Sequence, residues 1–201
     1  KNSKCITILY IGLRGLYKNF ASALDSIKQT QIELPEINFE LNVVGGGEFT
    51  EKERSAIEKS QIKINHYNNI SRSEIINIYR NSSLLIHPSY YEGFGITILE
   101  AMRLRKPVIA VDISPVREIA SETIFYASNK SSKSLSQALI YFLSKSNSQI
   151  NDKINQAYLA WIDQYSARDG SRNIVGEQLK NIRLSTGSLQ DFLIVVREIN
   201  S

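Results

Sequence analysis

Short apolar runs alternate with amphipathic segments along the first two-thirds of this 201-residue chain. The runs are apolar throughout rather than alternating in polarity, which is typical of strands that are buried on both faces. Strands of this kind, separated by helical segments, predict an α/β fold with a parallel sheet of about six strands between two layers of helices. The predicted strands are residues 5–11, 39–44, 62–66, 84–87, 108–111 and 123–126.

The segments between these runs have helical spacing. Ser71 followed by Glu74 forms a capping-box pattern, which predicts that a helix begins at Arg72. After Ser128 the pattern is helical, with a polar joint at residues 144–149, and the stretch 189–196 weakly favours a helix. Neither repeats nor low-complexity tracts divide the sequence, so residues 1–201 are interpreted as a single domain. The predicted helices are residues 18–29, 50–59, 72–80, 135–143 and 154–165, with a further helix starting at Ile96.

Bulk properties exclude several classes of protein. The net charge of +4 comes from dispersed residues that do not interleave with aromatic side chains, which disfavours a nucleic-acid partner. The sequence contains no apolar run long enough for a transmembrane span and no signal peptide. Cys5 is the one cysteine, so it has no partner for an intrachain disulfide, and its apolar strand predicts a small core residue. This usage fits a cytoplasmic protein.

The polar and glycine-rich segments follow predicted strands. In a parallel sheet, ligands bind beyond the carboxyl ends of the strands. Residues 12–18, 45–47, 66–71 and 92–97 all fall at such ends, so we expect them to meet at one edge of the sheet. Within the first of these segments, Arg14 and Lys18 are surface cations on the simplest interpretation, but a guanidinium fork beside glycine also suits a phosphate.

The most informative segment is HPSYYEGFGITILEAM, at residues 87–102. It joins a buried strand to a helix through a turn that contains Gly93 and Gly95, and glycine permits close approach of the backbone to a ligand. The free N–H groups at the start of the helix favour a phosphate or a polar sugar. Glu92 lies in the turn, and Glu100 faces away from the apolar stripe of the helix. A glycine turn with a capping glutamate and a solvated glutamate would give the same pattern.

Segment 87–102 resembles the Glu-x7-Glu motif of retaining glycosyltransferases of family 4, which have the GT-B fold. The resemblance extends to YIGLRGLYKNF at residues 10–20, to LNVVGGG at residues 41–47 and to PVIA at residues 107–110. It covers roughly two-thirds of the chain, from Thr7 to Leu143. It implies the Rossmann-like, C-terminal, donor-binding half of a two-domain enzyme. A chain that starts with Lys1 and enters a strand at once is then expected to be an excised piece without the N-terminal acceptor domain.

The resemblance also implies roles for individual residues. Arg14 and Lys18 would hold the donor diphosphate and stabilise the charge on the leaving nucleotide, as catalytic groups together with Glu92. Glu92 would contact the donor sugar, and Glu100 would accept hydrogen bonds from the ribose hydroxyls. No metal or other cofactor is expected, because such enzymes generally use protein cations instead. The other implied donor-binding residues are Gly12, Ile70, Gly93, Phe94, Gly95, Ile96 and Thr97. For Ile70, packing on the nucleotide base and a plain core position remain alternatives.

Other site chemistries fit the sequence less well. His66 and His87 lack a third metal ligand at a familiar spacing, and His87 is interpreted as a core residue or as a neighbour of the site. The glycines do not follow the Gly-x-Gly-x-x-Gly spacing of dinucleotide-binding folds. The two glutamates could form a glycosidase pair, but the resemblance gives them different ligands. The chain departs from the family at Arg105, where glycine is usual, and at residues 121–123, which replace a Gly-Asp turn.

The sequence thus predicts transfer of a hexose from a nucleotide-diphosphate sugar, of UDP or GDP type, to a hydroxyl acceptor with retention. The expected setting is polysaccharide, lipopolysaccharide or glycolipid synthesis in the cytoplasm, with peripheral contact of the full-length protein at the inner face of the membrane. We expect the isolated chain to be poorly active. A non-catalytic sugar-nucleotide-binding module and a sugar-nucleotide epimerase of similar fold are the alternatives. The nucleotide base, the sugar, the acceptor and the linkage are not readable from the sequence.

Overall fold

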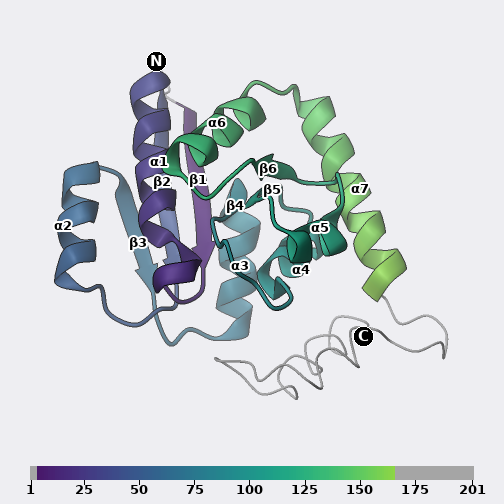
Figure 1. The fold of residues 1–201 in the computed structure, drawn as a ribbon, viewed down its shortest axis with the longest axis horizontal. Helices are drawn as coiled ribbons and strands as arrows, with labels where there is room; N and C mark the ends of the chain where they lie inside the picture. The colour runs from purple at the N-terminus through teal and green to yellow at the C-terminus, as the bar shows by residue number, and fades with distance from the viewer. Residues whose placement is uncertain (1–3, 166–201) are drawn as a thin grey trace. The chain divides into compact units, whose positions relative to one another are not determined.

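The computed structural model describes residues 4–165 and contains one six-stranded sheet in that range (Figure 1). All neighbouring strands pair in parallel, in the order β3-β2-β1-β4-β5-β6. This order starts at β1 and grows first toward one edge and then toward the other, which is the doubly wound Rossmann arrangement. The predicted α/β fold is therefore confirmed. The strands are β1 (Lys4–Ile11), β2 (Ile37–Val44), β3 (Lys63–Tyr67), β4 (Leu84–His87), β5 (Val108–Val111) and β6 (Phe125–Ala127).

Helices cover the sheet on both faces. Helix α1 (Phe20–Glu33) packs beside α6 (Ser132–Leu143), and α1 also contacts α2 (Glu51–Ser60) (Figure 1). On the other face, α3 (Arg72–Asn81) contacts β1, and α4 (Ile96–Arg103) contacts β4 and β5. The compact unit ends at Trp161, within α7 (Asn147–Tyr165), and a second unit starts at Ile162.

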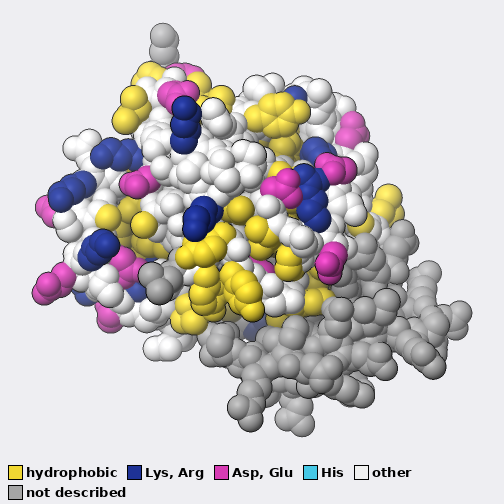
Figure 2. Space-filling view, in the orientation of Figure 1, with side chains coloured by type: hydrophobic (Ala, Val, Ile, Leu, Met, Phe, Trp, Pro, Cys, Tyr) yellow, Lys and Arg dark blue, Asp and Glu magenta, His cyan; other side chains and the backbone are white. Residues whose placement is uncertain are grey.

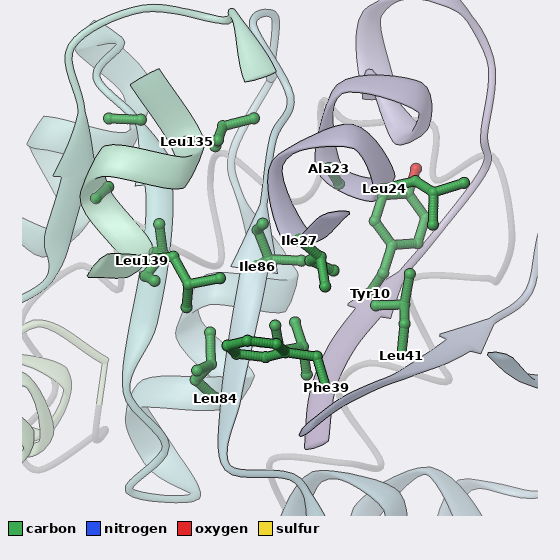
Figure 3. Packing of buried hydrophobic residues seen from close by; sticks show 14 of the residues in the cluster. Tyr10, Ala23, Leu24, Ile27, Phe39, Leu41, Leu84, Ile86, Leu135 and Leu139 are labelled. Carbon is green, nitrogen blue, oxygen red and sulfur yellow. The ribbon is translucent and has the colours of Figure 1, made fainter. Parts of the chain in front are cut away.

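The principal core lies between the sheet and the α1–α6 layer. Figure 3 shows side chains of α1 and α6 meeting those of the strands, including Ile27, Leu139 and Ile86. Because strand side chains alternate between faces, Ile8 and Tyr10 point into this core while Leu9 is buried on the opposite side. Both faces of β1 are therefore buried, which explains why its sequence is apolar throughout.

The first helix begins later than its sequence pattern predicts. The predicted segment 18–29 is divided at Asn19, which has a left-handed backbone (φ 56°) between the short 3-10 turn η1 (Leu16–Lys18) and α1. Asparagine tolerates this conformation better than most residues. The Asn19 amide donates to the carbonyl oxygens of Pro88 at 3.2 Å and Lys130 at 2.8 Å. These tertiary contacts are invisible to helical periodicity, so the sequence could not place the break.

Other elements agree in type and differ in extent. The Ser71–Glu74 capping box is present at the start of α3, as predicted. Helix α7 begins at Asn147, inside the predicted polar joint, because Ser146 and Gln149 cap it reciprocally. Helix α5 (Ser114–Ala120) was not predicted, since seven residues with a proline near the start carry little periodicity. The predicted 189–196 helix lies outside the described residues.

Cys5 corrects one sequence-based expectation. It is exposed rather than part of the core. The residue lies near the start of β1, on the face opposite Ile6, which is the first β1 residue in the principal core. The apolar character of β1 as a whole could not show which positions at its beginning lie beyond the covering helices.

Two arginine–aromatic stacks attach α7 to the C-terminal end of α4. The guanidinium carbon of Arg103 lies 5.2 Å from the ring centroid of Trp161, and that of Arg105 lies 4.0 Å from that of Tyr158. Arg105 adopts the left-handed backbone (φ 53°) for which glycine is usual, and it also donates to Asn155 Oδ1 at 3.0 Å. The stack and the hydrogen bond explain why this chain keeps an arginine at a strained position.

Figure 2 shows basic and acidic side chains interspersed on one face of the molecule. Within the part of the chain that the structure describes, none of the helices has the length and apolar character needed to cross a membrane.

Candidate functional site

The strand order places two predicted ligand-binding loops side by side. β1 and β4 are neighbours, and the sheet reverses its direction of growth between them. In open α/β sheets the crevice beyond the carboxyl ends of such a strand pair is the usual ligand site. The loop after β1 carries Gly12, Arg14 and Lys18, and the loop after β4 carries Glu92. These two loops, far apart in the sequence, thus lie at the same end of the sheet, as predicted.

Backbone contacts hold these two loops together. The Tyr90 amide donates to the Tyr17 carbonyl oxygen at 3.1 Å. The Asn19 side chain reaches the Pro88 carbonyl oxygen, and the Tyr17 and Tyr91 rings meet edge to face with centroids 6.0 Å apart. The loops after β1 and β4 therefore pack against each other and form one continuous surface.

Lys18, Glu92 and His87 meet at a single oxygen atom. Lys18 Nζ lies 2.5 Å from Glu92 Oε1, and His87 Nε2 lies 3.1 Å from the same oxygen. Burial alone would raise the pKa of Glu92, but the neighbouring His87 ring and Lys18 ammonium outweigh it and lower this pKa to about 2. Glu92 is therefore ionised throughout the physiological pH range. Its side chain is 10% exposed, so the ion pair is largely shielded from solvent.

The turn after Glu92 leads directly into α4. Gly95 forms the N-cap with a left-handed backbone (φ 79°), which favours glycine, and a Cβ there would lie 2.9 Å from Ile119 Cδ1 and push that methyl group aside. No side chain caps α4. The first N–H groups of the helix, and the positive end of its dipole, are thus available to an anion or a polar ligand.

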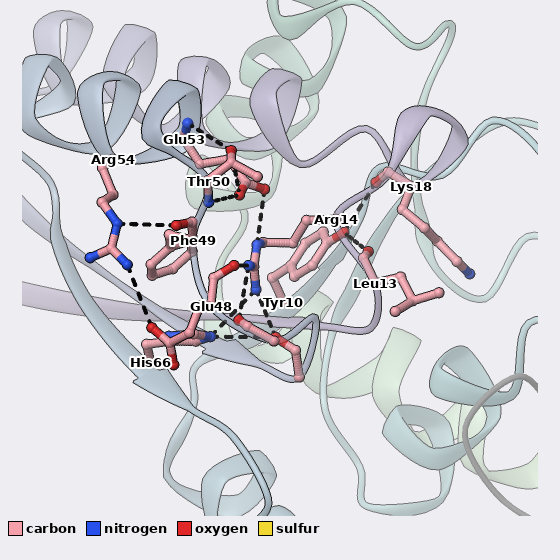
Figure 4. Close-up of polar contacts among 12 residues, drawn as sticks. Tyr10, Leu13, Arg14, Lys18, Glu48, Phe49, Thr50, Glu53, Arg54 and His66 are labelled. Carbon is pink, nitrogen blue, oxygen red and sulfur yellow. Dashed lines mark hydrogen bonds and ion pairs between the residues drawn. The ribbon is translucent and has the colours of Figure 1, made fainter.

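Arg14 occupies a different environment from the one predicted. Its place after β1 predicted a cation at an exposed edge, but its side chain is only 3% exposed. Its Nε donates to Glu53 Oε1 at 2.9 Å, and its two terminal nitrogens donate to the carbonyl oxygens of Gly45 (2.8 Å), Gly47 (2.9 Å) and Glu48 (2.7 Å) (Figure 4). His66 Nε2 lies 3.4 Å from one of these nitrogens. Arg14 therefore holds the glycine turn after β2.

The surroundings of Arg14 explain the glycine turn. A Cβ on Gly46 would lie 2.5 Å from an Arg14 terminal nitrogen, so a larger residue would displace the guanidinium. The Arg14 guanidinium also stacks on Phe49, with 4.3 Å from its central carbon to the ring centroid. In Figure 4 the Lys18 side chain extends away from this network. Arg14 and Lys18 thus belong to two separate clusters in this conformation.

Glu53 is a residue of this cluster that the sequence analysis did not single out. Its Oε2 accepts from the Thr50 backbone N–H at 2.8 Å, completing a capping box, while its Oε1 accepts from Arg14. Burial would raise the pKa of Glu53, but the hydrogen bonds from Thr50 and Arg14 lower it. The Thr-x-x-Glu spacing was visible in the sequence and marked the helix start. Nothing in that spacing indicated the contact with Arg14.

Glu100 is also less exposed than its place on the helical wheel predicted. Its Oε2 lies 3.0 Å from Tyr79 Oη, which is also 3.1 Å from the Thr97 carbonyl oxygen. Tyr79 is 1% exposed and comes from α3, which covers the side of α4 expected to be open. Burial raises the pKa of Glu100, opposed by the Tyr79 hydrogen bond and by the charges of Arg72 and Arg103. Glu100 is therefore a half-buried, hydrogen-bonded carboxyl group rather than a fully solvated one.

The remaining predicted residues lie along the same edge of the sheet. Gly12 follows β1 with φ 127° and donates to the Val44 carbonyl oxygen at 3.0 Å. Phe94 is buried, whereas Gly93 has open space where a Cβ would project. Ile96 and Thr97 form the first turn of α4. Ile70 is half-buried in the loop after β3, so two strand positions separate it from β1.

The two histidines lie in separate clusters, His66 with Arg14 and His87 with Glu92. Within residues 4–165 no three His, Cys, Asp or Glu side chains come together in a way that would hold a metal ion.

Comparison with known proteins identifies the family. Residues 1–158 match the family described as "Glycosyl transferases group 1". The chain belongs to this family. The match covers both loops of the crevice, so the resemblance in segments 10–20 and 87–102 is part of a fold-wide similarity.

Individual relatives agree with this assignment. Over 120 residues the chain is 30% identical to the O-antigen chain mannosyltransferase RfbU of Salmonella typhimurium, covering 58% of this chain and 31% of RfbU. A glycosyltransferase structure from Rickettsia africae superimposes with a TM-score of 0.68 at 25% identity, covering 80% of this chain and 44% of that one. The S. aureus TarM structure has a TM-score of 0.70 at 16% identity, covering 87% and 34%, and shares the fold. The chain spans less than a third of the curated relatives that it matches.

Proposed function

We propose that this chain is the donor-binding domain of a retaining glycosyltransferase that takes a hexose from a nucleotide-diphosphate sugar. The observation that supports this most directly is the meeting of Lys18 and Glu92 beside the uncapped N-terminus of α4, at the switch point of the sheet. A cation and helix N–H groups suit a diphosphate, and an ionised carboxylate beside them suits sugar hydroxyls. The acceptor in this proposal is a hydroxyl group of a growing polysaccharide, lipopolysaccharide or glycolipid.

In this proposal each cluster of the crevice has its own task. Lys18 leaves Glu92 for the diphosphate and stabilises the charge that develops on the leaving nucleotide. Glu92 contacts the sugar, and Glu100 accepts hydrogen bonds from the ribose, positioned by Tyr79. Arg14 reaches the diphosphate only by releasing carbonyl oxygens of the glycine turn, and otherwise it shapes the wall of the crevice. No step requires a metal or another cofactor, because protein cations and helix N–H groups supply the positive charge.

The relatives guide the choice of substrate class. RfbU is named as a mannosyltransferase of the O-antigen chain, and TarM was crystallised with UDP and with a GlcNAc-glycerol. For this chain we infer a donor of UDP or GDP type and an acceptor in a bacterial-type surface glycan. Since the matched relatives are much longer, the proposal includes an N-terminal acceptor domain that closes over the donor. It places the enzyme in the cytoplasm, in peripheral contact with the inner face of the membrane when the acceptor is lipid-linked.

Calorimetry with free UDP, GDP and ADP tests the proposal on the chain itself. We expect one nucleotide to bind more tightly than the other two, and Lys18→Ala to weaken that binding about tenfold. In the full-length enzyme, a donor panel in which released nucleotide and epimerised sugar are followed separately distinguishes transfer from epimerisation. Release of nucleotide that depends on an acceptor supports the proposal. Epimerised sugar, or binding without turnover in the full-length protein, contradicts it in favour of the epimerase or the non-catalytic module.

A further inference from the structure

His87 is a buried histidine at the carboxyl end of β4, in contact with the site on both sides of its ring. The residue is 5% exposed. Its Nδ1 lies 3.2 Å from Thr97 Oγ1 in the first turn of α4, and its Nε2 lies 3.1 Å from Glu92 Oε1. An ionised carboxylate can only accept, so a favourable contact requires the proton on Nε2. Nδ1 then accepts from the Thr97 hydroxyl, and this hydrogen bond orients the ring with Nε2 toward Glu92.

Lys18 and His87 share one acceptor. Both approach Glu92 Oε1, and Lys18 Nζ lies closer, at 2.5 Å. Although His87 Nε2 is within 3.1 Å of this oxygen, it is not aligned for a hydrogen bond, and it is the buried side-chain nitrogen left without one among the described residues. A buried donor without an aligned acceptor is unfavourable and is expected to take up its hydrogen bond when the acceptor becomes free.

We propose that His87 is a positioning residue. When Lys18 moves to the donor diphosphate, His87 replaces it as the hydrogen-bond donor to Glu92. Lys18 binds Glu92 when no donor is bound, and His87 Nε2–H binds it when the donor is bound. The Glu92 carboxylate therefore keeps the same orientation toward the sugar. This inference rests on the proposed function, since the movement of Lys18 is caused by a diphosphate. The histidine itself touches neither the sugar nor the phosphate. Its effect is on the rate, through the orientation of Glu92.

Kinetics of the full-length enzyme with UDP-glucose, GDP-mannose and ADP-glucose test this role. For the productive donor, His87→Leu should lower kcat about 10- to 100-fold, the scale expected for a misplaced reacting group, and leave the Kd of the free nucleotide within about twofold. His87→Gln places an amide N–H near the position of Nε2, and it should recover kcat to within about threefold of the wild type. Unchanged kcat in His87→Leu, no recovery in His87→Gln, or a parallel loss of nucleotide affinity would each overturn the inference.

A measurement without donor separates this inference from the proposed function. The chain contains two histidines, so imidazole signals are readily assigned by NMR. In Lys18→Met the Glu92 oxygen is free of its closest cation, and the His87 Nε2–H proton should move downfield and exchange more slowly with water than in the wild type. If the His87 Nε2–H signal does not change, the inferred hydrogen bond from His87 to Glu92 is wrong. If the signal changes as expected but the protein binds no nucleotide sugar, the inference about His87 stands and the proposed function fails.

Discussion

At the scale of single residues, the two glutamates of segment 87–102 lie in opposite electrostatic environments. Glu92 has its pKa lowered to about 2, because His87 and Lys18 outweigh the effect of burial. Glu100 has its pKa raised by burial, and its hydrogen bond with the fully buried Tyr79 only partly opposes this. One carboxylate is thus charged at any pH of interest, while the charge of the other depends on its neighbour. This difference makes their proposed contacts separable by pH.

Nucleotide affinity should therefore fall on acidification through the raised pKa of Glu100, because a protonated carboxyl group no longer accepts from both ribose hydroxyls. Tyr79→Phe removes a hydrogen bond to the charged form, so this fall should begin at a higher pH than in the wild type. At neutral pH it should weaken binding by about 1 kcal/mol. Calorimetry with the preferred free nucleotide between about pH 5 and pH 8 measures both effects.

Two variants serve as controls for this measurement. Glu100→Gln lacks the titrating group, so its affinity should show only the pH dependence that the nucleotide phosphates impose. Tyr126→Phe removes the hydroxyl of a tyrosine on β6, which bonds to the Ser121 carbonyl oxygen, and should behave as the wild type. An unchanged profile in Tyr79→Phe would contradict the assignment of Glu100 to the ribose.

At the scale of elements, Arg14 connects the end of β1 to the turn after β2 and to the first turn of α2. Its side chain meets three carbonyl oxygens and Glu53 while it stacks on Phe49. The glycine turn owes its shape to these bonds, since carbonyl oxygens that converge on one point need a cation between them. Arg14, to which the family resemblance assigns ligand binding, therefore also stabilises the glycine turn after β2.

Arg14→Ala should consequently lower the free energy of unfolding by about 3 kcal/mol, because it leaves converging carbonyl oxygens and a partly buried carboxylate without their donor. Urea denaturation followed by circular dichroism measures this loss. Arg54→Ala, which removes an exposed ion pair with Glu48 close to the same turn, is the matched control and should change stability by no more than about 0.5 kcal/mol. Equal stability of the two variants would show that Arg14 is not needed for the turn.

The sequence predicted which elements exist far better than where they begin. All six strands were located, most clearly β4 and β5, whose burial on both faces leaves a continuous apolar run. The break at Asn19 depends on carbonyl oxygens from two distant segments, and local periodicity contains no trace of them. The site shows the same limit. Motif spacing brought Lys18 and Glu92 to one crevice, whereas the contacts of His87, Tyr79 and Glu53 depend on how α3, α4 and the loops pack.

At the scale of the whole molecule, the described residues supply one side of the candidate site. The loops after β1 and β4 are tied to each other, and the helix N–H groups of α4 open beside them. The relatives that the chain matches are more than three times as long as the matched part. An arrangement of this kind favours capture of a ligand by the chain, while reaction with an acceptor requires a second surface to orient it.

The 201-residue chain should therefore bind the preferred nucleotide with an affinity close to that of the full-length enzyme, yet transfer sugar at least about 100-fold more slowly. Parallel calorimetry and measurement of acceptor-dependent nucleotide release on the two proteins provide the comparison. Loss of binding in the chain would mean that the proposed acceptor domain supplies donor contacts. Turnover by the chain at the full-length rate would contradict the two-domain proposal.

The pairing of β1 with β4 also has a consequence for how the protein acquires its site. The hydrogen bond from the Thr7 amide to Ser83 Oγ joins residues separated by 76 positions, and the Lys18–Glu92 pair spans 74. Closing loops of this length is slow compared with forming local helices and adjacent strand pairs. An intermediate that contains only β1, α1 and β2 would have half of the crevice. Nucleotide binding during refolding should thus appear with the slowest phase and report completion of the sheet.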